Sequence, residues 1–390
     1  MEPIRVPRLQ NESNTEYIYR ICSTKSENNW TWNNVRDIIN TELGYNYSES
    51  YYRKNYKNCS YKIMETSEDS NSELVDKLAE IRKERMKLSD ERAQNNAILR
   101  RLDREDTLIE IAKQVSKHLS GKKLLHTSFN TPTRKGKKKA ILELSDWHYG
   151  IEINNPWNIY NPNIAKERIT QLLNVVMHKC ESNDVDEIWV VNLGDLISGR
   201  IHDTIRIQNR IDVITQIIEV TEILMEFMAK LVASGYKVNY VSCNDNHSRL
   251  EPKKESSLDL ESLTRITDWV FKLTIGNKVT IIENKFGHDI ATFDIFDFKI
   301  VAVHGHKDTP KNIVPNMSLV THTYYNLALT AHLHHFSCDE QNETVIVSNG
   351  SLMGVDDYAQ TLRLTSRPSQ NLIICNPAAV IDSIHRIVLD

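Results

Sequence analysis

YKVNYVSCNDNHSRL, residues 236–250, joins a strand pattern directly to a cluster of polar side chains. Residues 236–242 are typical of a buried strand, and Asn244, Asp245 and Asn246 come next, followed at once by His247. A turn needs Asn or Asp, but it does not need the histidine. A metal or phosphate site at the end of a strand uses both kinds of side chain. This stretch therefore predicts a ligand site where the strand ends.

Other predicted strands end in the same kinds of side chain. Asp146 and His148 follow residues 140–145, Asp195 follows 187–193, His304 and His306 follow 298–303, and His332 and His334 follow 326–330. Beyond residue 139 apolar strands alternate with helices, which is the pattern of an α/β fold. Open α/β sheets bind ligands at the carboxyl ends of their strands. One such motif alone is weak evidence, but all of them together, each after a strand, predict a single site.

The residue types indicate a pair of divalent metal ions. Two ions about 3.5–4 Å apart need a bridging carboxylate, with oxygen and imidazole ligands on each side. A mixture of Asp, Asn and His suits Mn²⁺, Fe²⁺ or Zn²⁺ better than Ca²⁺, and the absence of thiolates argues against a structural zinc site. Cys243 and Cys338 lie near the motifs, but the ligand set is complete without them. We expect Mn²⁺ first, with Fe²⁺ or Zn²⁺ as the alternatives.

The order of these motifs resembles the calcineurin-like metallophosphoesterase superfamily over about residues 138–360. The resemblance implies a four-layer αββα sandwich and a metal-dependent phosphoesterase. It implies that Asp195 bridges the two ions, that a bridging water or hydroxide is the nucleophile, and that His247 stabilises charge or protonates the leaving oxygen. It also implies the remaining ligands, which are Asp146, His148 and His334 for one ion and Asn246, His304 and His332 for the other.

The chain departs from the family pattern in a few places. The family has Gly before the Asn-His pair, and this chain has Asp245. Because Asn and Asp tolerate a positive φ better than most residues, we expect Asn244 and Asp245 to make that turn. Residues 349–359, NGSLMGVDDYA, resemble the closing turn of the same superfamily. The candidates for contact with the substrate phosphate are Arg200, His202, Arg249 and His306.

Residues 1–65 predict a small helical domain with a helix-turn-helix plan. Thr31 is a candidate N-cap, and Gly44 is placed to end that helix. Ser48 is placed to cap a second, basic and aromatic helix over residues 49–57. Its candidates for nucleic-acid binding are Tyr51, Arg53, Lys54 and Lys57. The alternative is a helical adaptor that binds no DNA, with the tyrosines in its core.

Residues 70–119 contain no Gly or Pro and predict one long helix. Every seventh position from Leu74 to Ile109 is apolar except Asn95, a pattern that favours a dimeric coiled coil. The alternative is a long helix packed along its own domain. Residues 120–139, which include the run RKGKKK, predict a basic linker, and residues 140–390 form the expected catalytic domain.

Composition limits which partners and which cellular compartment we expect for the protein. The chain has 390 residues and a net charge of -4, so overall charge predicts no polyanion partner. Its six cysteines form no CxxC pair, which argues for a reducing compartment. No segment reaches the length of a membrane span or has the apolar core of a signal peptide. We expect a cytoplasmic protein, in the host cell if the chain is encoded by a phage.

Three functions fit the sequence. The whole chain resembles metallophosphoesterases of phages and prophages, which are similar to DNA-repair exonucleases such as the nuclease subunit of the SbcCD complex, so a DNA nuclease is the leading hypothesis. A phosphatase, or a phosphodiesterase of cyclic nucleotides or other small molecules, is the second. A DNA-binding scaffold with an idle metal site is the third. A cap that decides between substrates would lie in residues 150–162 or 205–231.

Overall fold

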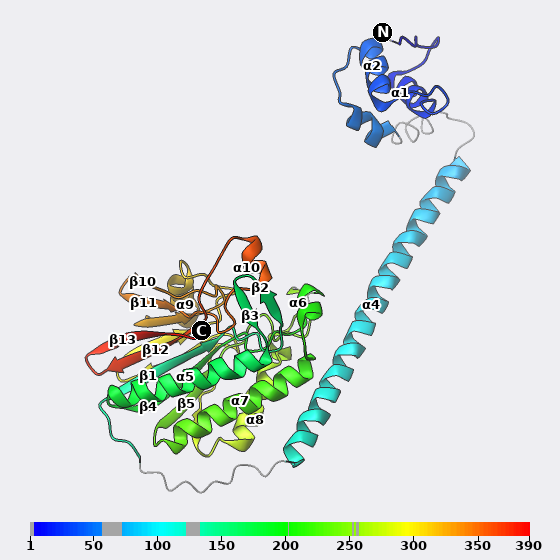
Figure 1. The fold of residues 1–390 in the computed structure, drawn as a ribbon. Helices are drawn as coiled ribbons and strands as arrows, with labels where there is room; N and C mark the ends of the chain where they lie inside the picture. The colour runs from blue at the N-terminus through cyan, green and yellow to red at the C-terminus, as the bar shows by residue number, and fades with distance from the viewer. Residues whose placement is uncertain (1–3, 57–71, 122–132, 202, 252, 255–256) are drawn as a thin grey trace. The chain divides into compact units, whose positions relative to one another are not determined.

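The computed structural model describes residues 4–56, 72–121, 133–201, 203–251, 253–254 and 257–390. The chain divides into two units, Met1–Asp103 and Arg104–Asp390. Figure 1 shows the course of the chain through both units. Among the described residues, no helix combines the length and the apolar character that crossing a membrane requires.

The C-terminal unit is built on two β-sheets. The larger has the strand order β13-β12-β1-β4-β5-β6, and the smaller has the order β10-β11-β9-β8-β7. The strands of the larger sheet are β1 (Lys138–Ser145), β4 (Val185–Gly194), β5 (Lys237–Ser242), β6 (Val279–Ile281), β12 (Ser369–Asn376) and β13 (Ala379–Val388). The strands of the smaller sheet are β7 (Ala291–Ile295), β8 (Phe298–Ala302), β9 (Leu327–Thr330), β10 (Ser337–Gln341) and β11 (Thr344–Ser348).

Parallel pairing brings the predicted motif strands side by side. In the larger sheet β1 pairs with β4, β4 with β5 and β5 with β6, all in parallel. In the smaller sheet β8 pairs with β9 and β9 with β11, again in parallel. The carboxyl ends of neighbouring parallel strands meet at one edge of a sheet. The motifs that follow β1, β4 and β5 therefore share one edge, and those that follow β8 and β9 share another.

The two sheets pack face to face through alternating apolar side chains. Ile141 and Val191 of the larger sheet share one core with Leu329 and Val347 of the smaller sheet. Leu142, the neighbour of Ile141, points to the opposite face, because successive side chains of a strand alternate. The region between the sheets is therefore the central core of the unit.

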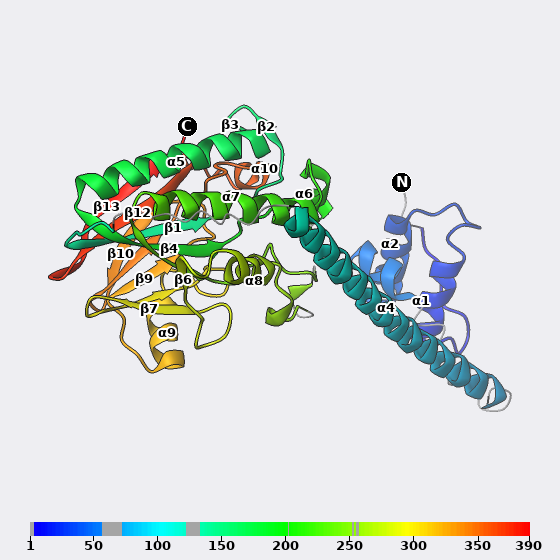
Figure 2. The ribbon, with the colours of Figure 1, turned by 90° about the horizontal axis from the view of Figure 1, so that it is seen from below.

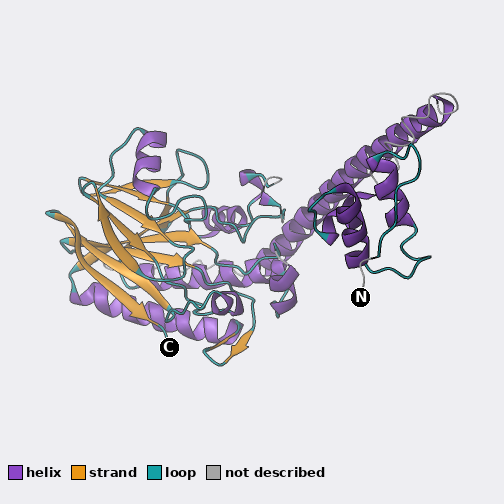
Figure 3. Cartoon of the chain, turned by 90° about the horizontal axis from the view of Figure 1, so that it is seen from above, coloured by secondary structure: helices purple, strands orange, loops and turns teal. Residues whose placement is uncertain are grey.

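Helices cover both outer faces of the sheet pair, as Figure 2 shows. Helices α5 (Pro162–Ser182), α7 (Val213–Ala233) and α8 (Thr264–Thr274) pack on the larger sheet. Helix α9 (Ile313–Thr321) packs on the smaller sheet through Ile313 and Met317. The expected four-layer αββα sandwich is confirmed, and Figure 3 shows its strands enclosed by helices.

The N-terminal unit contains α1 (Asn14–Ser23), α2 (Trp32–Leu43) and a further helical stretch over residues 49–56. Thr31 caps α2 by accepting a hydrogen bond from the backbone N–H of Asn34, and Gly44 ends the helix at a φ of 67°. Both predicted ends of this helix are confirmed. The core of the unit holds Tyr17, Ile21, Cys22, Val35, Ile38, Ile39 and Tyr52.

Helix α4 (Ser72–Gly121) is the predicted long helix. Of the predicted heptad positions, Ile81, Leu88 and Asn95 are exposed in the single chain. The side chains of Leu74, Leu102 and Ile109 lie outside the described residues. The structure confirms the helix, and the coiled coil stays a prediction.

The predicted basic linker ends inside the fold. Strand β1 begins at Lys138 rather than after residue 139. Lys138 pairs with Asp382 at 2.8 Å, and Lys139 lies 3.4 Å from Glu187. Arg134 stacks over the ring of Tyr236 at 4.6 Å. These basic side chains hold the start of β1 against the sheet and are engaged within the unit.

Gly194 gives a direct test of the packing at the sheet edge. Its φ is +97°, and a Cβ there would lie 2.4 Å from the Cβ of Asp245. Gly194→Ala therefore adds a steric clash to backbone strain, and we expect it to lower the free energy of unfolding by about 3 kcal/mol or more. Chemical denaturation of the purified protein measures this.

Gly287 is the matched control. Its φ is +96°, but a Cβ there would meet only a side-chain oxygen of Asp289 at 3.2 Å. Gly287→Ala should cost only the backbone strain, about 1–2 kcal/mol. Equal losses for the two variants would contradict close packing between the ends of β4 and β5.

Candidate metal centre

The site is built from residues whose backbone bends sharply where strands end. These residues have φ values between 43° and 68°, in the left-handed region that residues other than glycine rarely adopt, and they are Asp146, His148, Asp195, His332 and His334. Each such position costs on the order of 1–3 kcal/mol, and such strain clusters at functional sites. The sheets therefore hold these side chains in an unfavourable backbone geometry that turns them toward one another.

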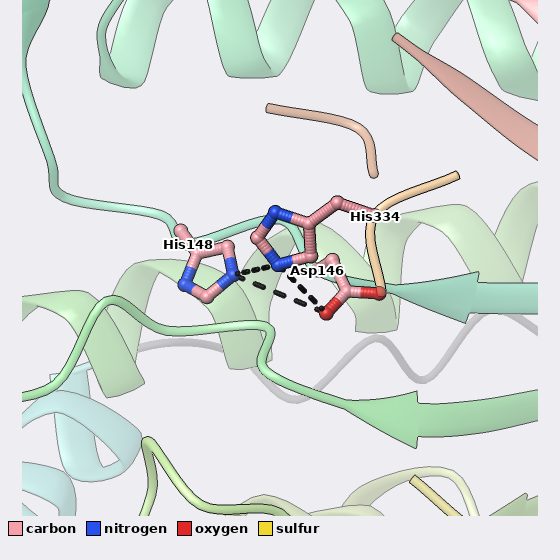
Figure 4. A group of neighbouring side chains, drawn as sticks. All are labelled: Asp146, His148 and His334. Atoms are coloured by element: carbon pink, nitrogen blue, oxygen red, sulfur yellow. Dashed lines mark hydrogen bonds and ion pairs between the residues drawn. The ribbon is translucent and has the colours of Figure 1, made fainter. Parts of the chain in front are cut away.

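The first group of candidate ligands is Asp146, His148 and His334, drawn in Figure 4. The Nε2 atoms of the two histidines are 3.1 Å apart. Asp146 Oδ1 lies 3.3 Å from His334 Nε2 and 3.9 Å from His148 Nε2. All of the facing atoms fall within 4.8 Å of one another, which is the spacing that three ligands of one ion require.

The second group contains Asp195, His304 and His332, with Asn246 beside them. Asp195 Oδ2 lies 3.0 Å from His304 Nε2, which is 2.9 Å from Asn246 Oδ1. His332 Nδ1 lies 3.2 Å from the same nitrogen of His304. The two predicted sets of ligands are thus brought together in the predicted grouping.

Asp195 lies between the two groups. Its Oδ2 is 3.0 Å from His304 Nε2 in one group and 4.0 Å from His148 Nε2 in the other. Both Asp195 Oδ2 and Asp146 Oδ1 are buried, and they face the imidazole nitrogens of His304 and His334. Buried carboxylates are costly unless cations pair with them, and either an imidazolium or a metal ion can be that cation. The residues present therefore fit a pair of metal ions with Asp195 between them.

Backbone carbonyls fix the orientation of two imidazoles. His304 Nδ1 lies 2.7 Å from the carbonyl oxygen of Leu193, and His247 Nδ1 lies 2.7 Å from that of Ser198. Because a carbonyl only accepts, each Nδ1 carries the proton and donates it. This leaves Nε2 of each ring facing the site, which is how buried ligand histidines are commonly held.

His247 forms a third candidate group with His148 and Asp195, whereas the family resemblance implies that it lies off the metal ions. Its backbone N–H donates to Asp195 Oδ1 at 3.1 Å, and its Nε2 lies 3.9 Å from Asp195 Oδ2. Its ring meets that of His148 edge-on at 4.5 Å between centroids. The His247 side chain thus reaches the candidate metal centre, while its Nδ1 donates to the backbone carbonyl of Ser198.

The charges of the site act strongly on one another. Burial opposes ionisation of Asp195, but the imidazoles of His304 and His247 outweigh burial and hold its pKa well below the ordinary range. Burial lowers the pKa of His304, yet the Asp195 carboxylate raises it to about 10. Burial also lowers the pKa of His334, but Asp146 first and Asp356 next raise it above the ordinary value.

Other histidines of the site stay neutral. Burial and the charge of His304 lower the pKa of His332 to about 4. Burial and the neighbouring His247 hold the pKa of His148 well below its ordinary value. Neutral imidazole is the form that binds a metal ion, so these two residues are ready to act as ligands.

A second layer of polar residues, which sequence reasoning missed, holds Asp146 in place. Ser351 Oγ donates to the backbone carbonyl of Asp146 at 2.9 Å, and Ser145 Oγ donates to its Oδ2 at 2.7 Å. Asn349 Nδ2 donates to Ser145 Oγ at 2.9 Å. The NGS sequence at residues 349–351, directly after β11 (Thr344–Ser348), is the signal that could have found them.

The turn at Asn244 and Asp245 differs from the prediction in its backbone conformation. Neither Asn244 nor Asp245 has a positive φ, so the expectation of a left-handed turn there was wrong. Asp245 Oδ1 instead accepts from the backbone N–H of Ser248 at 2.6 Å, and its Oδ2 accepts from Thr264 Oγ1 at 3.1 Å. Burial, with the nearby charge of Asp195, raises the pKa of Asp245. Its carboxyl braces the loop that carries Asn246 and His247.

The predicted substrate contacts lie in different surroundings, and His306 is beside the candidate ligands. His306 borders the second group, with its ring 5.4 Å from that of His304, and its buried Nδ1 accepts no hydrogen bond. Arg249 Nε donates to the backbone carbonyl of Glu251 at 3.1 Å. Arg200 is half-buried one residue after Gly199, and His202 lies outside the described residues.

The predicted nucleic-acid contacts lie on the helical stretch over residues 49–56. Tyr51, Arg53 and Lys54 are exposed, and the Tyr51 ring stacks on Tyr47 at 4.3 Å. The neighbouring Tyr52 is buried in the core. Lys57 lies outside the described residues.

Known proteins resemble this chain in its N-terminal part and along its whole length. Residues 2–72 match the family model described as the YonJ N-terminal domain. Over 394 aligned residues the chain is 27% identical to the SPbeta prophage-derived uncharacterized protein YonJ of Bacillus subtilis strain 168, covering 96% of each chain. That relative is similar to this chain from end to end.

Solved structures resemble about two-thirds of the chain. An archaeal phosphodiesterase is 14% identical, with 64% of this chain and 99% of that chain covered and a TM-score of 0.34. A zinc complex of Vps29 from Entamoeba histolytica is 13% identical, with 64% and 99% covered and a TM-score of 0.31. A predicted phosphoesterase from Streptococcus pneumoniae is 9% identical, with 64% and 98% covered and a TM-score of 0.27.

The raised pKa of His304 predicts proton release when a metal ion binds. With a pKa of about 10, His304 is protonated at neutral pH in the metal-free protein, so an entering ion must displace that proton. The apparent affinity for Mn²⁺ should therefore rise as the pH rises from 7 toward 10, by up to about tenfold per pH unit. Calorimetric titration in buffers of different ionisation enthalpy measures both the affinity and the protons released.

The exposed His335 provides the control, because its Nδ1 engages only the backbone carbonyl of Leu333. His335→Asn should leave the number of released protons unchanged. An Mn²⁺ affinity that stays flat across this pH range in the unaltered protein would contradict the charge state assigned to His304.

Proposed function

We propose that the C-terminal unit is a phosphodiesterase that uses two divalent metal ions to cleave nucleic acid, with DNA as the favoured substrate. The observation that carries the proposal is the buried Asp195 Oδ2, which faces imidazoles of both ligand groups. A carboxylate shared between two sets of ligands is the arrangement that two-metal hydrolysis requires. The whole chain resembles metallophosphoesterases of phages, which are similar to SbcCD-type nucleases, and this favours nucleic acid among the possible phosphodiesters.

Each residue has a definite part in the proposed reaction. Asp146, His148 and His334 would hold one ion, and Asn246, His304 and His332 would hold the other, with Asp195 shared. When bound, the ions would supply an activated water as nucleophile and neutralise charge on the phosphate. We favour Mn²⁺, since the donors are oxygen and imidazole nitrogen without thiolate.

His247 would act on the leaving oxygen. Its Nδ1 donates to the carbonyl of Ser198, so Nε2 is the atom that would face the reacting phosphate. A proton carried on Nε2 can pass to the leaving oxygen or stabilise its developing charge. The bond to Ser198 keeps the ring oriented throughout.

The N-terminal unit supports a nucleic-acid substrate. Tyr51, Arg53 and Lys54 offer an exposed aromatic ring and two exposed cations on one short helix. Cations attract the phosphate backbone, and rings stack on bases. Residues 2–72 would then be the part that recruits DNA.

Helix α4 supports a homodimer. Ile81, Leu88 and Leu99 are each at least half exposed in the single chain, at 50%, 53% and 63%. A second copy of the helix would cover such side chains in a coiled coil over residues 70–119. A dimer would also bring two N-terminal units to one nucleic acid and raise their effective concentration.

A reducing compartment fits the cysteines. The described cysteines are all thiols, and they are Cys22, Cys180, Cys243, Cys338 and Cys375. Thiols persist in the cytoplasm, where disulfides are rare. We therefore place the activity in the cytoplasm, which is the host cytoplasm for a phage-encoded chain.

The direct test is cleavage of end-labelled single- and double-stranded DNA with Mn²⁺, with and without EDTA. We expect cleavage that EDTA abolishes. His247→Ala should lower kcat by about 10²–10⁴-fold, the usual contribution of a general acid, while Mn²⁺ binding is retained. His178→Ala is the control, because the side chain of His178 lies on α5, away from both ligand groups, and should not affect cleavage.

The outcomes separate the candidate functions. Hydrolysis of bis-p-nitrophenyl phosphate without cleavage of DNA would contradict the nuclease and favour a phosphatase or small-molecule phosphodiesterase. Bound metal with neither activity would favour a DNA-binding scaffold with an idle site.

A further inference from the structure

Three short segments adjoin the loop that carries His148, since the backbone N–H of Glu152 donates to the carbonyl of Gln208 and the hydroxyl of Tyr160 donates to that of Trp147. They are the hairpin of β2 (Ile153–Asn155) and β3 (Asn158–Tyr160), helix α6 (Asp203–Gln208) and helix α10 (Asp357–Thr361), and together we call them the rim. Figure 1 shows them gathered at one end of the sheets.

A single carboxylate joins the three segments. Asp357 Oδ1 accepts from Asn155 Nδ2 of the hairpin at 2.9 Å, and its Oδ2 accepts from Gln208 Nε2 of α6 at 2.7 Å. Asn158 Nδ2 donates to the backbone carbonyls of Met353 and Val355, each at 2.9 Å. The rim is thus one connected surface rather than three independent loops.

The rim presents large apolar side chains to water. The aromatic ones are Trp157 at 66% exposed and Tyr358 at 70% exposed, and Ile207 on α6 is 83% exposed. Arg206 is exposed on α6 beside Ile207, and Arg363 is exposed two residues after the end of α10. Exposed apolar side chains on segments that are joined to one another are a common feature of binding surfaces.

The side chains of the rim indicate which class of ligand it binds. Exposed aromatic rings next to arginines are the combination that binds unpaired bases, because every base has a face that stacks and every nucleotide has a phosphate. A double helix hides the faces of its bases, so it would not use these rings. The neighbouring centre offers ligands for ions that act on a phosphodiester.

We propose that the rim binds the unpaired bases of a single-stranded nucleic acid through Trp157 and Tyr358, next to the phosphodiester to be cleaved. Arg206 and Arg363 pair with the flanking phosphates. This inference rests on the proposed function, and it narrows the substrate to single strands or to the unpaired end of a duplex.

The test measures binding apart from catalysis. Fluorescence anisotropy in EDTA gives the Kd for a labelled oligothymidylate of about six nucleotides, a length within the site size of one binding domain. All proteins compared, the reference included, are full chains that carry Tyr51→Ala, Arg53→Ala and Lys54→Ala, so that the N-terminal unit does not contribute to the Kd. Trp157→Ala combined with Tyr358→Ala should raise this Kd by at least about tenfold, as expected for the loss of two stacked bases. An oligonucleotide of the same length with abasic sites should bind weakly and respond little to the double substitution.

Two matched variants serve as controls. Trp157→Phe combined with Tyr358→Phe keeps both rings and should stay within about threefold of the reference, since stacking tolerates the change of ring. Trp269→Ala removes a tryptophan of α8 that is 53% exposed, and it should leave the Kd unchanged. An equal loss in the Phe variant would assign the effect to altered folding and overturn the stacking role.

The outcomes distinguish the rim from the metal centre. An unchanged Kd in the Ala double variant, no binding by the reference, or an equal loss with the abasic oligonucleotide would overturn the proposal and favour a protein partner for this surface. Failure of the unaltered protein to hydrolyse bis-p-nitrophenyl phosphate with Mn²⁺ would overturn the proposed function instead. Because EDTA removes the metal ions, the Kd comparison tests the rim in either case.

Discussion

Parallel pairing of β1 with β4 is the constraint on which the site depends. The register sets Ser145 beside Gly194, so Asp146 and Asp195 leave the sheet as neighbours. Backbone hydrogen bonds continue past the strand ends, from Asp146 N to the carbonyl of Gly194 and from His148 N to that of Asp195, each at 3.0 Å. Two buried carboxylates are thereby fixed close together.

That proximity carries an electrostatic cost that the surroundings must offset. Like charges at short range oppose each other's ionisation, and burial opposes both. Imidazoles of His304 and His334 approach the carboxylates to 3.0 Å and 3.3 Å and hold both pKa values down. The histidines neutralise the charge of the two carboxylates only in part, and a pair of bound metal ions would neutralise the rest.

Much of the candidate site and of the strand pattern could be predicted from the sequence, because the signals lie within a few neighbouring residues. Strands that run into Asp, Asn or His show both their ends and their chemistry within a few residues, and the caps of α2 follow from Thr31 and Gly44. The roles of Ser351, Asn349 and Asp357 could not be predicted in the same way. Each acts on a residue about 150–200 positions away, through a contact that only the assembled sheets create.

The basic run at residues 134–139 shows the limit of reasoning from charge. Its composition favoured a solvated linker that could follow a nucleic-acid backbone. In the structure, Lys138 and Lys139 pair with acidic side chains, and Arg134 covers an aromatic ring. A count of charges gives no information on pairing, so the features that support nucleic-acid binding are the helical stretch over residues 49–56 and the rim.

The most direct test of the two-metal centre is anomalous diffraction from crystals loaded with Mn²⁺. We predict two peaks per chain, about 3.5–4 Å apart, on either side of Asp195 Oδ2. A single peak, or none near Asp195, would contradict the two-metal centre.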